Sequence, residues 1–114
     1  MNTPPCVYIA GSYSSDPAGN TRRAMDLANH LLDLGYAVEC PHLSHYLHLR
    51  AERPYEEWLA HGLAKLKRCD VLLWDQGWIP GPSPGAQKEL IEAEVADMGV
   101  CWTVADLCEQ YPAS

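Results

Sequence analysis

The sequence alternates short apolar runs with longer segments of helical periodicity, and this alternation restricts the fold more than any other feature. The apolar runs are rich in β-branched and aromatic residues, as strands are, and the longer segments repeat apolar residues every three to four positions, as helices do. A β-α order repeated four times predicts parallel strands joined by right-handed crossovers. The expected strands are 6–10, 36–41, 69–74 and 100–104, and the expected helices are 21–34, 54–68, 83–98 and 105–110.

These elements predict a three-layer α/β domain with helices on both faces of a four- to five-stranded parallel sheet. At 114 residues the chain forms one domain, 1–114, with a single core. Ligands of such sheets bind outside the carboxyl ends of the strands. The segments that carry function are therefore expected at 11–20, 42–53 and 75–89, and 42–53 is expected to be loop-like or irregular.

Composition excludes several classes of partner. The net charge of −7 argues against polymeric nucleic acid, because binding to phosphates needs clustered Lys and Arg. No apolar run approaches the roughly 20 residues that span a bilayer, and the first residues lack the basic-then-apolar pattern of a signal peptide. Five cysteines without a C-x-x-C pair favour reduced thiols in a cytoplasmic protein over a disulfide framework, with a catalytic cysteine as the less favoured alternative.

A glutamate stands among alanines near the start of the last long helix. Ser83 is a good N-cap for this helix, and Pro84 suits its first position. At helical spacing Glu89 shares a face with Ala86 and Ala93. A carboxylate held against small residues beside a crevice is a candidate nucleophile or base. The alternative is an ordinary acidic, solvated helix, since further acidic residues follow: Glu92, Glu94 and Asp97.

The first loop and the His-rich segment also invite ligand hypotheses. The loop 11–20 supplies small hydroxyl residues before a helix N-terminus, which could hold a phosphate or a sugar hydroxyl, or could simply form the turn and the cap. His42, His45 and His48 could suggest a metal site, but no Cys or carboxylate in the same segment completes a ligand set. Lining of a pocket, or an oligomer contact, is favoured for these histidines instead.

Tryptophan is abundant, and its positions suggest two roles. Trp78 lies in a Gly/Pro-rich loop at the expected ligand edge, where its ring could stack on a flat base. Trp58 and Trp102 are expected in the core.

Taken in order, the motifs resemble those of the nucleoside 2-deoxyribosyltransferase superfamily, in particular its small bacterial and phage branch. The match covers nearly the whole chain, and the succession of motifs is more specific than any one of them. The matching stretches are V-Y-I-A-G-S-Y-S (7–14) with Asn20 and Arg23, C-P-H-L-S-H (40–45), R-P-Y-E-E-W (53–58), C-D-V-L-L (69–73), G-W (77–78) and S-P-G-A-Q-K-E (83–89).

The resemblance implies a flavodoxin-like fold and cleavage or transfer at the N-glycosidic bond of a nucleoside or nucleoside 5′-monophosphate, without metal or other cofactor. The family's glutamate nucleophile, four residues after a glycine, falls on Glu89 after Gly85, and its first-strand tyrosine falls on Tyr8. The family also implies a homo-oligomer. The implied substrate-binding residues are Gly11, Ser12, Tyr13, Ser14, Asn20, Arg23, His42, Trp78, Ser83, Gly85 and Ala86, with the hydroxyl of Ser12, Ser14 or Ser15 on a 5′-phosphate.

The sequence departs from the family pattern at one acidic position. Gly62 stands where the family commonly has an aspartate, eight residues before Asp70. Asp70 begins its strand, at the wrong end for a ligand, so Asp75, at the carboxyl end, is the expected substitute for the acid that protonates the departing base. The alternative function is a catalytically silent nucleotide-binding or nucleoside-binding module with the same fold.

Overall fold

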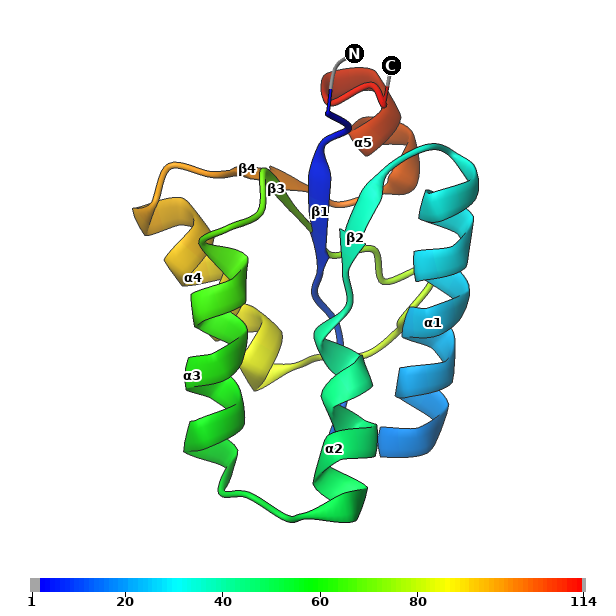
Figure 1. Cartoon of the computed structure of the whole chain (residues 1–114). Helices are drawn as coiled ribbons and strands as arrows, with labels where there is room; N and C mark the ends of the chain where they lie inside the picture. The colour runs from blue at the N-terminus through cyan, green and yellow to red at the C-terminus, as the bar shows by residue number, and fades with distance from the viewer. Residues whose placement is uncertain (1–2, 114) are drawn as a thin grey trace.

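The computed structural model describes residues 3–113 as an α/β domain built on a four-stranded, all-parallel sheet (Figure 1). The strand order is β2-β1-β3-β4, so the chain reverses its direction of travel across the sheet between β1 and β3. This is the flavodoxin-like order, and it confirms the predicted fold class. The strands are β1 (Cys6–Ile9), β2 (Ala37–Glu39), β3 (Val71–Leu73) and β4 (Gly99–Cys101).

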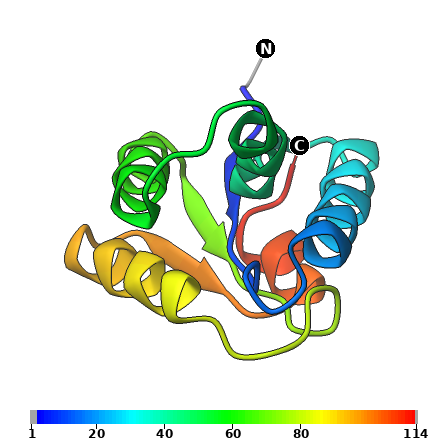
Figure 2. The same cartoon turned by 90° about the horizontal axis from the view of Figure 1, so that it is seen from below.

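The helices cover both faces of this sheet, which gives the three-layer sandwich. Viewed from below, α1 and α5 pack on one face, and α3 and α4 pack on the other (Figure 2). The helical elements are α1 (Pro17–Asp33), the 3-10 turn η1 (Pro41–Leu43), α2 (Ser44–Arg50), α3 (Tyr55–Leu66), α4 (Pro84–Val95) and α5 (Val104–Gln110).

Side-chain caps explain where three helices begin. The predicted N-cap Ser83 accepts a hydrogen bond from the Ala86 N–H at 3.0 Å, and Thr103 does the same for the first turn of α5. Asp16 caps α1, which therefore begins four residues before the predicted start at 21. Gly35 lies in the turn that follows α1 and has φ +98°, a conformation that glycine adopts without strain.

Two expectations about local structure were wrong. The segment 42–53 is not irregular, because η1 and α2 together cover 41–50. The helix that begins after Ser83 ends at Val95 rather than at 98, and Asp97 then turns the chain with φ +55°. In α2 no residue is buried, so the segment lacks the core-facing apolar stripe from which helices are recognised.

The two faces of the sheet bury separate apolar clusters. The larger one packs Leu27 and Leu31 of α1 and Leu107 of α5 against the strands. The smaller one packs Leu66 of α3 and Ala93 of α4 against the opposite face. Each fully buried leucine stabilises the fold by about 1.5–3 kcal/mol, so both faces contribute to stability.

The edge of the sheet at the amino ends of the strands is tied together by polar contacts. Asp70 accepts a hydrogen bond from the Cys6 N–H at 2.7 Å, in keeping with its predicted place away from the ligand edge.

The five cysteines are free thiols. Trp102 was expected in the core but is 49% exposed. Within residues 3–113, no helix is both long and apolar enough to span a membrane.

Candidate functional site

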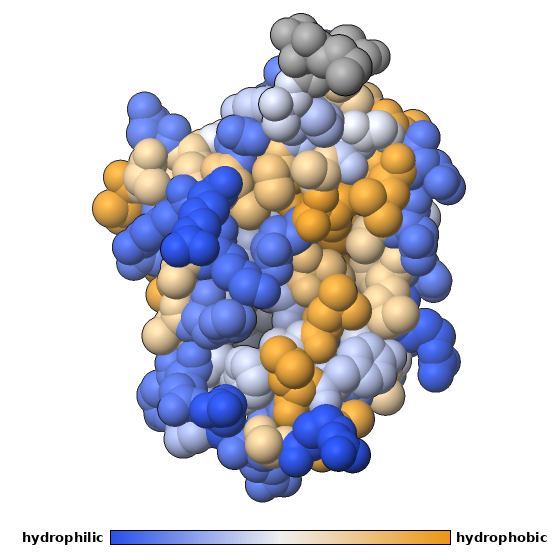
Figure 3. All heavy atoms as spheres, in the orientation of Figure 1, coloured by the Kyte–Doolittle hydropathy of each residue, from blue (hydrophilic) through white to orange (hydrophobic). Residues whose placement is uncertain are grey.

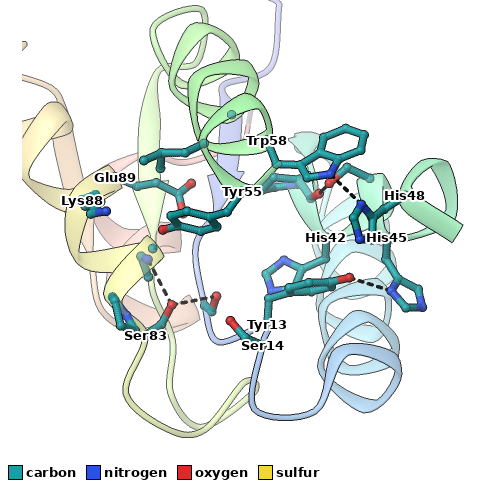
Figure 4. Close-up of a pocket in the computed structure, with 18 of the residues that line it drawn as sticks. Tyr13, Ser14, His42, His45, His48, Tyr55, Trp58, Ser83, Lys88 and Glu89 are labelled. Atoms are coloured by element: carbon teal, nitrogen blue, oxygen red, sulfur yellow. Dashed lines mark hydrogen bonds between the residues drawn. The ribbon is translucent and has the colours of Figure 1, made fainter. Parts of the chain in front are cut away.

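A cavity of about 620 Å³ opens beside the carboxyl ends of β1 and β2. Its walls come from four parts of the chain: β1 with the loop that follows it, η1 with α2, α3, and the first turns of α4. Figure 4 shows the labelled side chains from these elements converging on the cavity. Elements distant in sequence thus meet where an open parallel sheet binds its ligands.

Glu89 and Tyr8 form one end of the cavity. Tyr8 is a central residue of β1 and is 1% exposed, and Glu89 projects from the second turn of α4. Burial raises the pKa of Glu89 to about 7, against a smaller lowering by a hydrogen bond with the Tyr8 hydroxyl. Burial and the neighbouring Glu89 raise the pKa of Tyr8, which therefore stays a phenol. One oxygen of Glu89, Oε2, is buried without a hydrogen-bond partner.

Gly62 lies over this pair, on the inward face of α3. The residue is buried, and a Cβ atom here would lie 3.0 Å from the Tyr8 hydroxyl oxygen. The space beside Glu89 that a longer side chain at position 62 would need is therefore already occupied by Tyr8.

The three histidines all line the cavity, as the pocket hypothesis for this segment predicted. The buried His42 ring places Nε2 2.9 Å from the Ser12 carbonyl oxygen, and burial lowers the pKa of His42, so its ring is neutral. His45 Nδ1 lies 2.8 Å from the Tyr13 hydroxyl. Because the ring partners of both histidines lie within the loop after β1, η1 and α2 are attached to that loop.

His48 is held by a different element. The Trp58 indole N–H of α3 donates a hydrogen bond to His48 Nδ1 at 2.9 Å (Figure 4). The Arg53 backbone N–H donates to the same nitrogen at 3.2 Å. Trp58, which the sequence suggested for the core, is thus a wall of the cavity that orients His48.

The rim of the cavity carries two cationic side chains. Lys88 of α4 places its ammonium 5.2 Å from the centre of the Tyr55 ring, a cation–π distance. Arg53 forms an exposed ion pair with Glu57 at 3.2 Å. Both Lys88 and Arg53 line the cavity.

The structure brings together most of the residues that the sequence nominated. Those that line the cavity are Tyr8, Gly11, Tyr13, Ser14, His42, Ser83, Gly85, Ala86 and Glu89. Those that do not are Ser12, Asn20, Arg23, Asp75 and Trp78.

Each residue in the second group makes its contacts outside the cavity. Ser12 donates to the carbonyls of the loop before α4. The Asn20 amide donates to the Tyr13 carbonyl and receives a hydrogen bond from Arg23 at 2.9 Å. The Trp78 ring stacks on His30 with 5.1 Å between ring centres, so it packs against α1 rather than over the cavity.

Asp75 follows the carboxyl end of β3, two residues after its last residue, but points to the other side of the sheet edge. Its Oδ1 accepts from the Gly77 N–H at 2.9 Å, and its Oδ2 accepts from the Val104 N–H at 3.0 Å. Both oxygens therefore fix backbone, one in the loop after β3 and one at the start of α5. The structure does not place this carboxyl beside Glu89.

Arg53, Tyr55, Trp58 and Lys88 are among the residues of the cavity wall that the sequence had not singled out as site residues. Three of them belong to the run R-P-Y-E-E-W, whose proline and aromatic residues were the available signal. No three His, Cys, Asp or Glu side chains within residues 3–113 gather as metal ligands would.

Comparison with known proteins gives a family but no activity. No curated protein matches the chain. Residues 5–102 match the family described as a domain of unknown function, DUF4406. That range contains every strand, α1 to α4 and all of the cavity wall. The chain therefore belongs to the DUF4406 family.

Proposed function

We propose that this protein cleaves or transfers at the N-glycosidic bond of a nucleoside or a nucleoside 5′-monophosphate, with Glu89 as the nucleophile. The observation that carries the proposal is the state of Glu89: a carboxyl with one buried, unpartnered oxygen at the end of a ligand-sized cavity. Buried polar atoms are normally hydrogen-bonded, and the exceptions are often functional. A pKa of about 7 leaves a substantial ionised fraction at neutral pH.

The flanking residues suit this chemistry. The neutral Tyr8 phenol donates a hydrogen bond and therefore holds the carboxylate in place. Aromatic rings of Tyr13, Tyr55 and Trp58 line the rest of the cavity, where a planar base would find apolar contact. The motifs that resemble the nucleoside 2-deoxyribosyltransferase superfamily support the same assignment.

The proposed reaction retains configuration in two displacements. A Glu89 oxygen attacks C1′ of the sugar, and the C1′–N bond breaks with its electron pair passing to the base, which takes up a proton from water. The product is a glycosyl ester of Glu89. Attack on C1′ by water, or by a ring nitrogen of a second base, then frees the carboxylate. Water gives a hydrolase and a second base gives a transferase.

A second candidate is a nucleotide-binding module without turnover. The observation in its favour is that Gly62 supplies no acid to the cavity, while both oxygens of Asp75 bind backbone N–H groups elsewhere. Such a protein would keep the pocket and recognise the same nucleosides or nucleotides.

We further propose a small-molecule partner, a cytoplasmic location and a homo-oligomer. Exposed apolar side chains gather on the outer face of η1 and α2, where Figure 3 shows an apolar strip beside a hollow, and again on α4. They are Leu43, Tyr46, Leu47, Leu49, Ile91 and Val95. Exposed apolar side chains grouped in this way are typical of contacts between subunits.

The test is base release from a panel of the common ribonucleosides and 2′-deoxynucleosides and their 5′-monophosphates, followed by chromatography. Glu89→Gln keeps the shape of the side chain and removes its nucleophilic oxygen. Glu94→Gln is the matched control, because Glu94 lies on the same helix and is exposed.

Base release by the parent protein and by Glu94→Gln, but not by Glu89→Gln, is the expected result. Trapping of a sugar–protein ester by mass spectrometry would place the bond on α4. Release that survives in Glu89→Gln would overturn the mechanism. Binding of one panel member without release by any form of the protein would establish the second candidate instead.

A further inference from the structure

We propose that His48 recognises the base of the ligand by donating a hydrogen bond from Nε2–H to an acceptor nitrogen on the edge of that base. This inference rests on the proposed function, because it assumes that a nucleoside or nucleotide occupies the cavity. It gives a role to His48, a residue of α2 to which the family motifs assign none.

The partners of His48 determine which of its nitrogens carries the proton. Trp58 Nε1–H and the Arg53 backbone N–H both approach Nδ1, at 2.9 and 3.2 Å. Both groups can only donate. Nδ1 must therefore present its lone pair, and the proton of the neutral ring resides on Nε2. His48 is thus fixed as a donor through Nε2.

His48 lies on the side of the cavity away from Glu89. Both residues line the cavity, Glu89 from α4 and His48 from α2, and Figure 4 shows them on opposite sides of it. A nucleoside with its C1′ at Glu89 would extend its base away from α4, between Tyr55 and Trp58 and toward His48. No hydrogen-bond partner of His48 Nε2 is present among residues 3–113.

A donor at this place would help bond breaking as well as binding. As the C1′–N bond breaks, electron density accumulates on the base, and its acceptor nitrogens become stronger acceptors. A hydrogen bond from a fixed donor then strengthens in the transition state. His48 would in this way offset the absence of a carboxyl at position 62, although a neutral imidazole stabilises the departing base and does not protonate it.

Binding measurements test the inference apart from catalysis. The probes are 2′-deoxyadenosine with its 1-, 3- and 7-deaza analogues, and 2′-deoxycytidine with its 3-deaza analogue, each of which replaces one acceptor nitrogen by C–H. Affinities are measured by calorimetry in Glu89→Gln protein, with and without His48→Leu. His61→Leu is the matched control, because His61 contacts Trp58 edge-on but does not line the cavity.

We expect one deaza analogue to bind about 5- to 10-fold more weakly than its parent, the usual loss for one neutral hydrogen bond. His48→Leu should abolish that difference, and His61→Leu should preserve it. In wild-type protein, nitrogen-15 NMR should show His48 as the Nε2–H tautomer, and Trp58→Phe, which leaves the Arg53 backbone N–H as a donor to Nδ1, should weaken that preference without reversing it.

Equal discrimination with and without His48, or a His48 ring protonated on Nδ1 in the neutral form, would overturn the inference while leaving base release through Glu89 intact. If His48 discriminates between a parent nucleoside and its deaza analogue but the wild-type protein releases no base, the inference is confirmed and glycosidase activity is ruled out. If none of the probes binds at millimolar concentration, the inference fails, whereas the proposed function stands or falls on base release from the full panel of nucleosides and 5′-monophosphates.

Discussion

The backbone of Gly62 lies so close to Tyr8 that a Cβ atom at position 62 would approach the Tyr8 hydroxyl oxygen to 3.0 Å. The glycine and the tyrosine therefore share one space above Glu89. A glycine inside a helix ordinarily costs about 1 kcal/mol relative to alanine, so this position accepts a less stable helix in exchange for room for the hydroxyl.

The shared space predicts coupling between substitutions at positions 62 and 8. Gly62→Ala should give no gain in the free energy of unfolding in the wild-type background, because the new methyl group presses on the Tyr8 hydroxyl. In a Tyr8→Phe background the same substitution should stabilise the protein by about 0.5–1 kcal/mol, as alanine does in an unobstructed helix. Urea denaturation of the four proteins measures this cycle. Additive effects would show that the two residues do not compete.

Tyr8→Phe should raise the pKa of Glu89. The Tyr8 hydroxyl donates to the ionised carboxylate, and its removal leaves burial to raise the pKa of Glu89 further above about 7. The rising limb of base release against pH should then move to higher pH. The carboxyl carbon-13 resonance of Glu89 reports the same titration in protein without substrate, and an unchanged midpoint there would contradict the prediction.

Glu89 should also make stability depend on pH. The folded protein holds a proton on Glu89 up to about pH 7, whereas the unfolded chain loses it at the ordinary, lower pKa. The free energy of unfolding from this group therefore falls as pH rises from about 4.5 to 7, by roughly 3 kcal/mol, and then levels off.

A variant isolates this contribution. Glu89→Gln should be more stable than wild type at pH 8 and nearly equal to it at pH 4, whereas Glu94→Gln should track wild type throughout. The comparison cancels His42, whose lowered pKa gives the opposite trend below about pH 6.5. Thermal unfolding across this pH range measures the difference. A gap that is constant with pH would mean that the Glu89 carboxyl titrates normally.

Asp75→Asn should act on stability rather than on chemistry. Asparagine keeps one acceptor oxygen, so either the Gly77 or the Val104 N–H loses its partner, at a cost of about 1–3 kcal/mol. Base release by the folded protein, measured well below the melting temperature, should fall less than about threefold. Loss of release without loss of stability would restore the role of Asp75 as the acid.

The strand and helix pattern could be predicted from the sequence because it depends on periodic burial. The run 69–74 is recognisable since its residues fill a sheet core, and β3 lies inside it. The run 100–104 shares only residues 100–101 with β4, which begins at Gly99, and Trp102 and Thr103 are exposed. The helix α2 was missed for the complementary reason. Its leucines, Leu47 and Leu49, are 59% and 67% exposed, so no apolar face points inward.

The candidate site was predictable where a backbone position fixes the direction of a side chain. Glu89 was nominated from its helix face and Tyr8 from the resemblance, and both occupy regular elements, in which the period fixes the direction of a side chain. Asp75 and Trp78 follow a strand in a loop, where the sequence gives the location but not the orientation. Asp75 is turned by two backbone N–H groups, and Trp78 by the ring of His30. Of these partners, only Gly77 is close in sequence to the residue it orients; Val104 and His30 are distant.

Among the five α-helices of residues 3–113, α2 is the one that buries no residue. The wall that carries His45 and His48 is therefore attached by polar contacts rather than by the core. Segments with few buried contacts open most readily. The amide hydrogens of α2 should therefore exchange with solvent sooner than those of α1, and a ligand bound in the cavity should slow the exchange of α2.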